Sequence, residues 1–213
     1  MTNDALITFY GGTFDPIHYG HLKPVISLAR FLDLKKIIIL ISNIPLYRSA
    51  PIASFWQRVE MVRLATIEIA NNLFIIDKQV LHKSSSSWIV EIFKALRRQH
   101  GITVPIAFII GQDSLLTLPT WKYSWELSGL CHLLVCTRPG YSNQLTDRYH
   151  NYSLIKNPNI LYKKPSGLIY CATTPKFTIS SSNIRTRYQA NLSCESLLPV
   201  SVQAYIDEQG LYR

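Results

Sequence analysis

The sequence lacks long hydrophobic runs. Its longest purely aliphatic stretch, IIILI from Ile37 to Ile41, is far shorter than the roughly 20 apolar residues that a membrane-spanning helix needs. The first ten residues, MTNDALITFY, contain no lysine or arginine, so they lack the basic start of a signal peptide. We therefore expect no membrane partner and a cytoplasmic location.

Cysteine is scarce as well, and its spacing excludes two kinds of site. Cys131, Cys136, Cys171 and Cys194 form no C-x-x-C pair, and no histidine stands at zinc-finger distance from them. We predict reduced, mostly buried thiols, as in a cytoplasmic protein. Cys131 and Cys136 bracket the apolar segment CHLLVC, and in a strand they would face opposite sides of the sheet.

Two familiar phosphate-binding motifs are absent. The chain contains no G-x-x-x-x-G-K, which excludes a P-loop, and no G-x-G-x-x-G, the usual dinucleotide-binding fingerprint. The net charge is 22 − 13 = +9, but the basic residues are scattered rather than gathered on one helix. This distribution favours a solvated basic surface over a nucleic-acid partner. A second interpretation is that part of the charge faces an anionic small molecule.

Short apolar runs alternate with longer helical segments along the chain. With 213 residues and 47% hydrophobic content, the chain is long enough for one domain with a well-buried core. Alternation at this spacing predicts an α/β fold, with an open, doubly wound parallel sheet and right-handed crossovers. The expected strands are 5–10, 35–41, 73–77, 105–110 and 131–136, and the expected helices are about 19–31, 55–70, 86–100 and a last one ending at Gly210.

Two regions near the end of the chain differ from this pattern. Residues from about 140 to 178 are less regular and are expected to form an elaboration of the fold. Residues from about 180 to 213 are expected to form a small C-terminal helical part. We predict a single domain over residues 1–213.

The unusual loops each follow an expected strand. They are GGTFDPIH, SNIPLYR, GQDSLLTLPTW and TRPGY. In an open parallel sheet the ligand binds beyond the carboxyl ends of the strands, where the strand order reverses. The sequence therefore predicts one site built from these loops.

The first of these loops has the features of a phosphate cradle. Gly11 and Gly12 allow a close backbone approach, and the helix that follows offers free N–H groups and the positive end of its dipole to an anion. His18 and His21, three residues apart, lie on one face of the first turns, and Gly20 leaves room between them. The histidine pair could also bind a metal, but no third ligand and no H-E-x-x-H stands nearby, so we predict no metal held by the protein alone.

These residues resemble a known family. GGTFDPIHYGHL resembles the H-x-G-H signature of the nucleotidyltransferase superfamily, and IIGQDSLLTLPTW, VCTRPGY, ISSSNIR and YIDEQGLYR resemble its nicotinate-nucleotide adenylyltransferase branch nearly end to end. The resemblance implies a Rossmann-like nucleotidyltransferase fold. It implies adenylyl transfer from ATP to nicotinate mononucleotide in NAD biosynthesis, giving nicotinate adenine dinucleotide and pyrophosphate, with Mg²⁺ accompanying ATP.

The resemblance also implies roles for individual residues. His18, His21 and Arg185 would be catalytic, because they would hold the triphosphate and the leaving pyrophosphate. The residues implied to bind ATP are Gly11, Gly12, Thr13, Phe14, Gly20, Gly111, Asp113, Arg138, Ile179, Ser180, Ser181 and Ser182. The residues implied to bind the acceptor are Arg48, Trp88 and Trp121, with the pyridine ring stacked on Trp121.

The acceptor side departs from the family's pattern. The family's P-P-H-K or P-P-H-R reads I-P-L-Y-R here, so Tyr47 stands in the histidine position and Arg48 keeps the cation. The family's Tyr-Thr pair is Trp88-Ile89, and Ile89 cannot hydrogen-bond a carboxylate through its side chain. Transfer to nicotinamide mononucleotide or phosphopantetheine and a non-catalytic nucleotide-binding regulator therefore stay open. The sequence indicates no oligomeric state.

Overall fold

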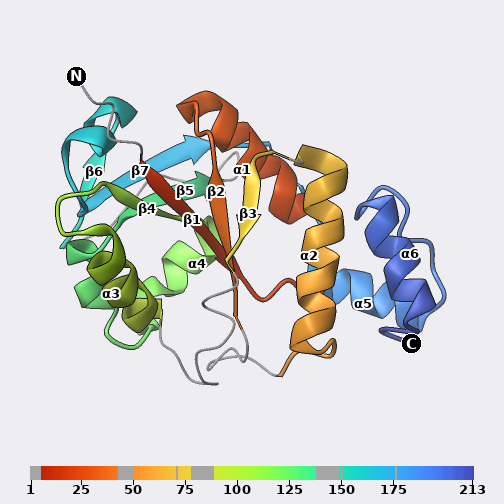
Figure 1. The fold of residues 1–213 in the computed structure, drawn as a ribbon. Coiled ribbons are helices and arrows are strands. Elements are labelled where there is room, and N and C mark those ends of the chain that lie inside the picture. Colours follow the sequence, from red (N-terminus) through yellow and green to blue (C-terminus); the bar gives the residue numbers. More distant parts are fainter. Residues whose placement is uncertain are drawn as a thin grey trace.

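The strands of the computed structural model form one parallel sheet. The structure describes residues 6–42, 50–70, 72–77, 89–137, 149, 151–175 and 177–213. In this part of the chain the seven-stranded sheet has the order β3-β2-β1-β4-β5-β7-β6, and each neighbouring pair is parallel (Figure 1). The predicted open parallel sheet is confirmed. The strands are β1 (Ile7–Gly12), β2 (Ile37–Ile41), β3 (Phe74–Ile76), β4 (Ile106–Gly111), β5 (His132–Thr137), β6 (Ser153–Ile155) and β7 (Leu168–Thr173).

Helices cover both faces of this sheet. Figure 1 shows α3 on one side of the sheet, and α1 and α2 on the other. The helices are α1 (Tyr19–Leu32), α2 (Phe55–Ala70), α3 (Ile89–His100), α4 (Gln112–Thr117), α5 (Ser181–Gln189) and α6 (Val200–Glu208), with the 3-10 helices η2 (Leu118–Thr120), η3 (Ser124–Gly129) and η5 (Pro158–Lys163). The doubly wound architecture is thus confirmed as well.

Alternating side chains of the central strands form two cores. In β4, Ile106 and Phe108 pack in the core under α3, whereas Ala107 and Ile109 pack in the core under α1 and α2. This alternation is the period of two that a strand imposes on its side chains. A strand covered on both faces therefore reads as one unbroken apolar run, as IIILI does in β2.

The cysteines follow the same alternation. Cys131 lies in the core under α3 and Cys136 in the core under α1 and α2, so the prediction of opposite faces is confirmed. All four thiols are free, and only Cys171 is not fully buried.

The region from 140 to 178 contains structure that the sequence pattern did not indicate. β7 lies inside the sheet between β5 and β6, although no strand was predicted there. Such short apolar runs cannot be told from loop by periodicity alone, and β6 and β7 become strands through their pairing with distant residues. The segment after β4, which was predicted as a loop, forms the short helix α4 instead.

The order of the strands fixes where a ligand can bind. From β1 the chain builds outward through β2 and β3 and then returns to β4 on the other side of β1. The carboxyl ends of β1 and β4 therefore flank the point where the strand order reverses, the usual place for a ligand in such sheets.

The C-terminal helices pack beside α2 (Figure 1). Glu68 on α2 accepts hydrogen bonds from the amides of Val200 (3.1 Å) and Ser201 (2.9 Å) and so caps the first turn of α6. Ile184 and Ile206 belong to the same core as α1 and α2. A single domain with a C-terminal helical part stays a prediction. None of the helices that the structure describes is long and apolar enough to cross a bilayer.

Candidate active site

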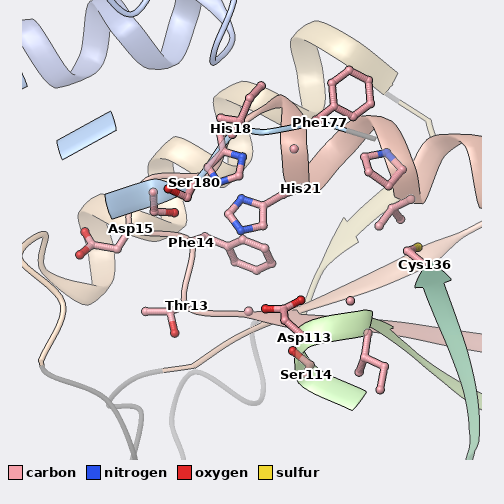
Figure 2. A pocket seen from close by; sticks show the side chains of 18 of the residues that line it. Thr13, Phe14, Asp15, His18, His21, Asp113, Ser114, Cys136, Phe177 and Ser180 are labelled. Atoms are coloured by element: carbon pink, nitrogen blue, oxygen red, sulfur yellow. The ribbon is translucent and has the colours of Figure 1, made fainter. Parts of the chain in front are cut away.

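A pocket of about 600 Å³ opens at the carboxyl ends of β1 and β4 (Figure 2). Its walls are the loop after β1, the first turns of α1, the start of α4 and the N-terminus of α5. The predicted catalytic and ATP-binding residues that the structure describes all line it. They are Gly11, Gly12, Thr13, Phe14, His18, Gly20, His21, Gly111, Asp113, Ile179, Ser180, Ser181, Ser182 and Arg185.

Of the predicted acceptor-binding residues, the structure describes only Trp121. Trp121 is half-buried against the core under α3, and its Nε1 donates to Thr117 Oγ1 at 3.3 Å. It does not line the pocket, so its stacking role stays a prediction. Arg48, Trp88 and Arg138 lie outside the described residues.

The two histidines of the cradle are stacked on each other. Their ring centroids are 3.7 Å apart and the ring planes meet at 23°. Both Nδ1 atoms are buried and have no hydrogen-bond partner in the described part of the protein. Both residues line the pocket. Buried polar atoms are normally paired, so the two unpartnered atoms single out these rings as candidates to contact a polar ligand.

Burial keeps both imidazoles neutral. Desolvation, helped by the neighbouring His21 ring, lowers the pKa of His18 to about 2. Desolvation lowers the pKa of His21 to about 4, and the charge of Asp113 opposes that shift. At neutral pH each ring therefore keeps one N–H donor and carries no charge.

Phe14 fixes the position of His21. Its ring meets the His21 ring edge-on, with centroids 5.3 Å apart, and a Cβ on Gly12 would stand 2.6 Å from that phenyl ring. Phe14 itself has a positive φ of 53°. Gly12 thus serves the packing of Phe14, which in turn supports the His21 ring.

Gly20 serves a close approach rather than an open space. A Cβ there would lie 3.0 Å from the His18 ring and 3.1 Å from the Ile179 carbonyl oxygen. The room predicted beside Gly20 is therefore occupied by His18 and by the segment leading into α5. The missing side chain lets the first turn of α1 lie against the segment that leads into α5.

The first amides of α1 are less free than predicted. The Tyr19 amide donates to the Leu197 carbonyl (3.0 Å), and the His21 amide donates to the His18 carbonyl (2.9 Å). The imidazoles and the N-terminus of α5 therefore contribute more of the cradle than the end of α1 does.

The start of α5 completes the pocket. Ser180 is its N-cap, with its Oγ accepting from the Asn183 amide at 3.2 Å, which confirms the predicted cap. Ser181 Oγ donates to the Pro16 carbonyl (2.9 Å). Arg185 Nη1 donates to the Asp15 carbonyl (2.8 Å), so the same helix is tied to the cradle twice.

Two features of the site were missed from the sequence. Thr174, Pro175 and Phe177 line the pocket just after β7, and they were overlooked because β7 itself was. Arg58 on α2 is fully buried and donates to the carbonyls of Thr13 (2.7 Å) and Ser42 (2.6 Å), which ties together the loops after β1 and β2. The only sequence signal for Arg58 was a charge in an amphipathic helix, a pattern that normally faces solvent.

The histidine pair should make stability fall in acid. Because the native pKa of His21 is lowered to about 4, the unfolded chain takes up a proton first as the pH falls below the ordinary value near 6.5. The free energy of unfolding therefore falls by about 2 kcal/mol for this group between about pH 7 and pH 5. Urea unfolding of wild type and His21→Gln at both pH values measures the difference, and equal losses in the two proteins would contradict the assignment.

Gly20→Ala should impair the site without unfolding the protein. The added methyl group must displace the His18 ring or the Ile179 backbone by a few tenths of an ångström. We therefore expect kcat/KM for the adenylyl transfer that the sequence predicts to fall about tenfold. Gly129→Ala is the matched control, since a Cβ there meets nothing within 4 Å. Steady-state kinetics measure the loss of activity, and melting curves show whether the variant is still folded. Unchanged kinetics in Gly20→Ala would show that the contact does not matter.

Comparison with known proteins adds a family to this geometry. A family model described as cytidylyltransferase-like matches residues 9–187. Two curated relatives are each called a probable nicotinate-nucleotide adenylyltransferase. One from Sodalis glossinidius (strain morsitans) is 52% identical and one from Baumannia cicadellinicola subsp. Homalodisca coagulata is 50% identical, in both cases over 100% of this chain and 100% of the relative.

Solved structures share the fold. The Plasmodium falciparum nicotinic acid mononucleotide adenylyltransferase complexed with NaAD superposes with a TM-score of 0.70 at 20% identity, covering 98% of this chain and 97% of that one. The same protein complexed with APC gives a TM-score of 0.70 at 19% identity, with the same coverage. At this identity the likeness extends to the architecture alone.

Proposed function

The chain belongs to the cytidylyltransferase-like family, among the nicotinate-nucleotide adenylyltransferases, and we propose that it transfers the adenylyl group of ATP to nicotinate mononucleotide. The products are nicotinate adenine dinucleotide and pyrophosphate, which places the reaction in NAD biosynthesis. The observation that carries the proposal is the pair of stacked, neutral histidines that line the pocket between β1 and β4 and whose buried Nδ1 atoms have no partner among the described residues.

The chemistry needs no nucleophile from the protein. A phosphate oxygen of the mononucleotide attacks the α-phosphorus of ATP; the new O–P bond forms as the bond to the leaving pyrophosphate breaks. What the protein supplies is positioning and stabilisation of developing charge. His18 and His21 donate hydrogen bonds to the triphosphate, and Arg185 places its fork-shaped cation on the β- and γ-phosphates.

Mg²⁺ is proposed to arrive with ATP, as part of the substrate. No group of three metal-binding side chains occurs among the residues that the structure describes. Magnesium in nucleotide sites commonly keeps its waters and uses the substrate's phosphates with one or two carboxylates. Asp113, an exposed carboxylate on the pocket wall, has the right chemistry to contact it.

The choice of acceptor is the least constrained part of the proposal. Ile89, at the first turn of α3, cannot form the side-chain hydrogen bond of the family's threonine. Tyr47 can donate a hydrogen bond but cannot carry the charge of the family's histidine. Side chains therefore discriminate less here between the acid and the amide mononucleotide. Steady-state kinetics with ATP, Mg²⁺ and each mononucleotide test the proposal. A higher kcat/KM for the acid supports it, and a higher value for the amide makes the protein a nicotinamide mononucleotide adenylyltransferase.

Two further experiments separate the remaining alternatives. Phosphopantetheine has no ring to stack on Trp121 and should not act as an acceptor. No pyrophosphate release with any acceptor would mean a nucleotide-binding regulator.

The scattered charge supports the proposed absence of a nucleic-acid partner, and the free thiols agree with a cytoplasmic location.

A further inference from the structure

The penultimate residue of the chain reaches the base of the phosphate cradle. Tyr212 follows α6, and its side chain is buried, with only 3% of the residue's surface exposed. Its hydroxyl donates to Asp15 Oδ1 at 2.7 Å, across 197 positions of sequence. Burial and the hydrogen bond to Asp15 raise the pKa of Tyr212 well above its ordinary value, so the hydroxyl keeps its proton and acts as a donor.

The carboxylate of Asp15 holds the segment before α2 as well as Tyr212. It lies in the loop after β1 and is 6% exposed. Its Oδ2 accepts from the Ile52 amide (2.9 Å) and its Oδ1 from the Ala53 amide (3.1 Å), which holds the segment before α2. In Figure 2 it points away from His18 and His21, so it does not share their part of the cavity.

Arg185 forms a long ion pair with the same carboxylate and no side-chain hydrogen bond to it among the contacts described. Its Nη1 donates to the Asp15 backbone carbonyl at 2.8 Å and lies 3.8 Å from Oδ2. The side chain is 26% exposed and lines the pocket. A short rotation would bring the guanidinium onto the carboxylate and away from a ligand.

The hydroxyl of Tyr212 and the guanidinium of Arg185 lie on the two oxygens of this one carboxylate. A buried carboxylate that loses one of its donors draws a neighbouring cation closer, because a poorly solvated buried charge is costly. The tyrosine adds a neutral donor to Oδ1, beside the Ala53 amide. We propose that Tyr212 is a positioning residue, whose hydrogen bond to Asp15 keeps the Arg185 guanidinium free to bind the β- and γ-phosphates of ATP and the pyrophosphate product.

This inference rests on the proposed function, and its test uses binding of pyrophosphate and of adenosine, without an acceptor. Tyr212→Phe removes one oxygen and leaves the ring in its core. We expect the affinity for pyrophosphate, measured by calorimetry, to fall about tenfold, as for loss of a hydrogen bond to a charged group. The affinity for adenosine, which carries no phosphate, should stay unchanged.

Tyr188→Phe is the matched control. Tyr188 is a neighbour of Tyr212, with ring centroids 6.3 Å apart. The substitution removes the same hydroxyl group from a tyrosine that makes no described hydrogen bond to Asp15. It should bind both ligands as wild type does. Equal pyrophosphate affinities in Tyr212→Phe and Tyr188→Phe, or a parallel loss of adenosine binding, would overturn the inference.

A double-mutant cycle separates positioning from simple destabilisation. In Asp15→Asn no carboxylate remains to draw Arg185 away, so adding Tyr212→Phe should not weaken pyrophosphate binding further. A further loss in the double variant would contradict the inference, even if Tyr212→Phe alone were too unstable to assay. The protein and its variants could differ in pyrophosphate affinity as expected while the protein transfers no adenylyl group. That result would reject the proposed function and leave the inference standing.

Discussion

His21→Ala is expected to lower kcat at least about 100-fold, the loss typical for one donor to a developing charge in an active site. The ring sits on the pocket wall with its Nδ1 buried and unpartnered, and the edge of Phe14 holds it in place. Because burial keeps the imidazole neutral, its contribution is a positioned N–H rather than a positive charge. The KM for ATP should change much less than kcat, since the donor acts mainly on the transition state.

A second substitution distinguishes hydrogen bonding from packing at this position. His21→Asn removes part of the ring but can place an amide N–H close to the position of Nδ1, so it should recover part of the lost kcat. His100→Ala, on α3 beside Phe9 and away from the pocket, makes the same deletion and should keep normal turnover. Near-normal kcat in His21→Ala would remove His21 from the mechanism.

Arg185→Ala is expected to lower kcat/KM for ATP by about 100-fold, as for loss of a hydrogen bond to a charged group together with its charge. The side chain reaches the pocket from the first turns of α5, and its Nη1 is held by the Asp15 carbonyl, which leaves other N–H groups for phosphate oxygens. Steady-state kinetics at varied ATP measure the loss. Arg185→Lys should recover only part of it, because an ammonium cannot reproduce the planar fork.

The neighbouring Arg187 provides the control for charge. It lies two residues further along α5 and donates to the Ser193 carbonyl at 2.7 Å, away from the pocket. Arg187→Ala makes the same change in net charge and should keep kcat/KM within about twofold of wild type, as for a surface substitution. Equal losses in the two variants would assign the effect to overall charge instead of to Arg185.

The sequence was most informative where local pattern and structure share one cause. The run IIILI gave β2, since a strand buried on both faces must be apolar throughout. Gly101, with a φ of 95°, ends α3 where it was expected, because its amide closes the last turn onto the Arg97 carbonyl. The glycine-histidine loop likewise gave the position of the pocket, because ligands in parallel sheets bind after the strands.

The sequence was least informative where a residue's meaning depends on a distant partner. β6 and β7 exist as strands through pairing, so the pocket residues Thr174, Pro175 and Phe177 that follow β7 were missed from the sequence. Arg58 looked like a solvent-facing charge, and burial against the carbonyls of Thr13 and Ser42 gives it another role. The space beside Gly20 was expected to be open, yet the His18 ring and the Ile179 carbonyl occupy it.

Sequence alone determined the order of β1 to β5 with α1, α2 and α3 between them, the two-sided core and the loop that carries His18 and His21, because periodicity and glycine placement act over a few residues. Only the tertiary structure decided that the two rings stack, that their pKa values fall, and that Asp15 joins Tyr212 to the surroundings of Arg185. The physical reason is that desolvation and hydrogen-bond competition depend on what surrounds an atom in space. Neighbours along the chain do not specify those surroundings.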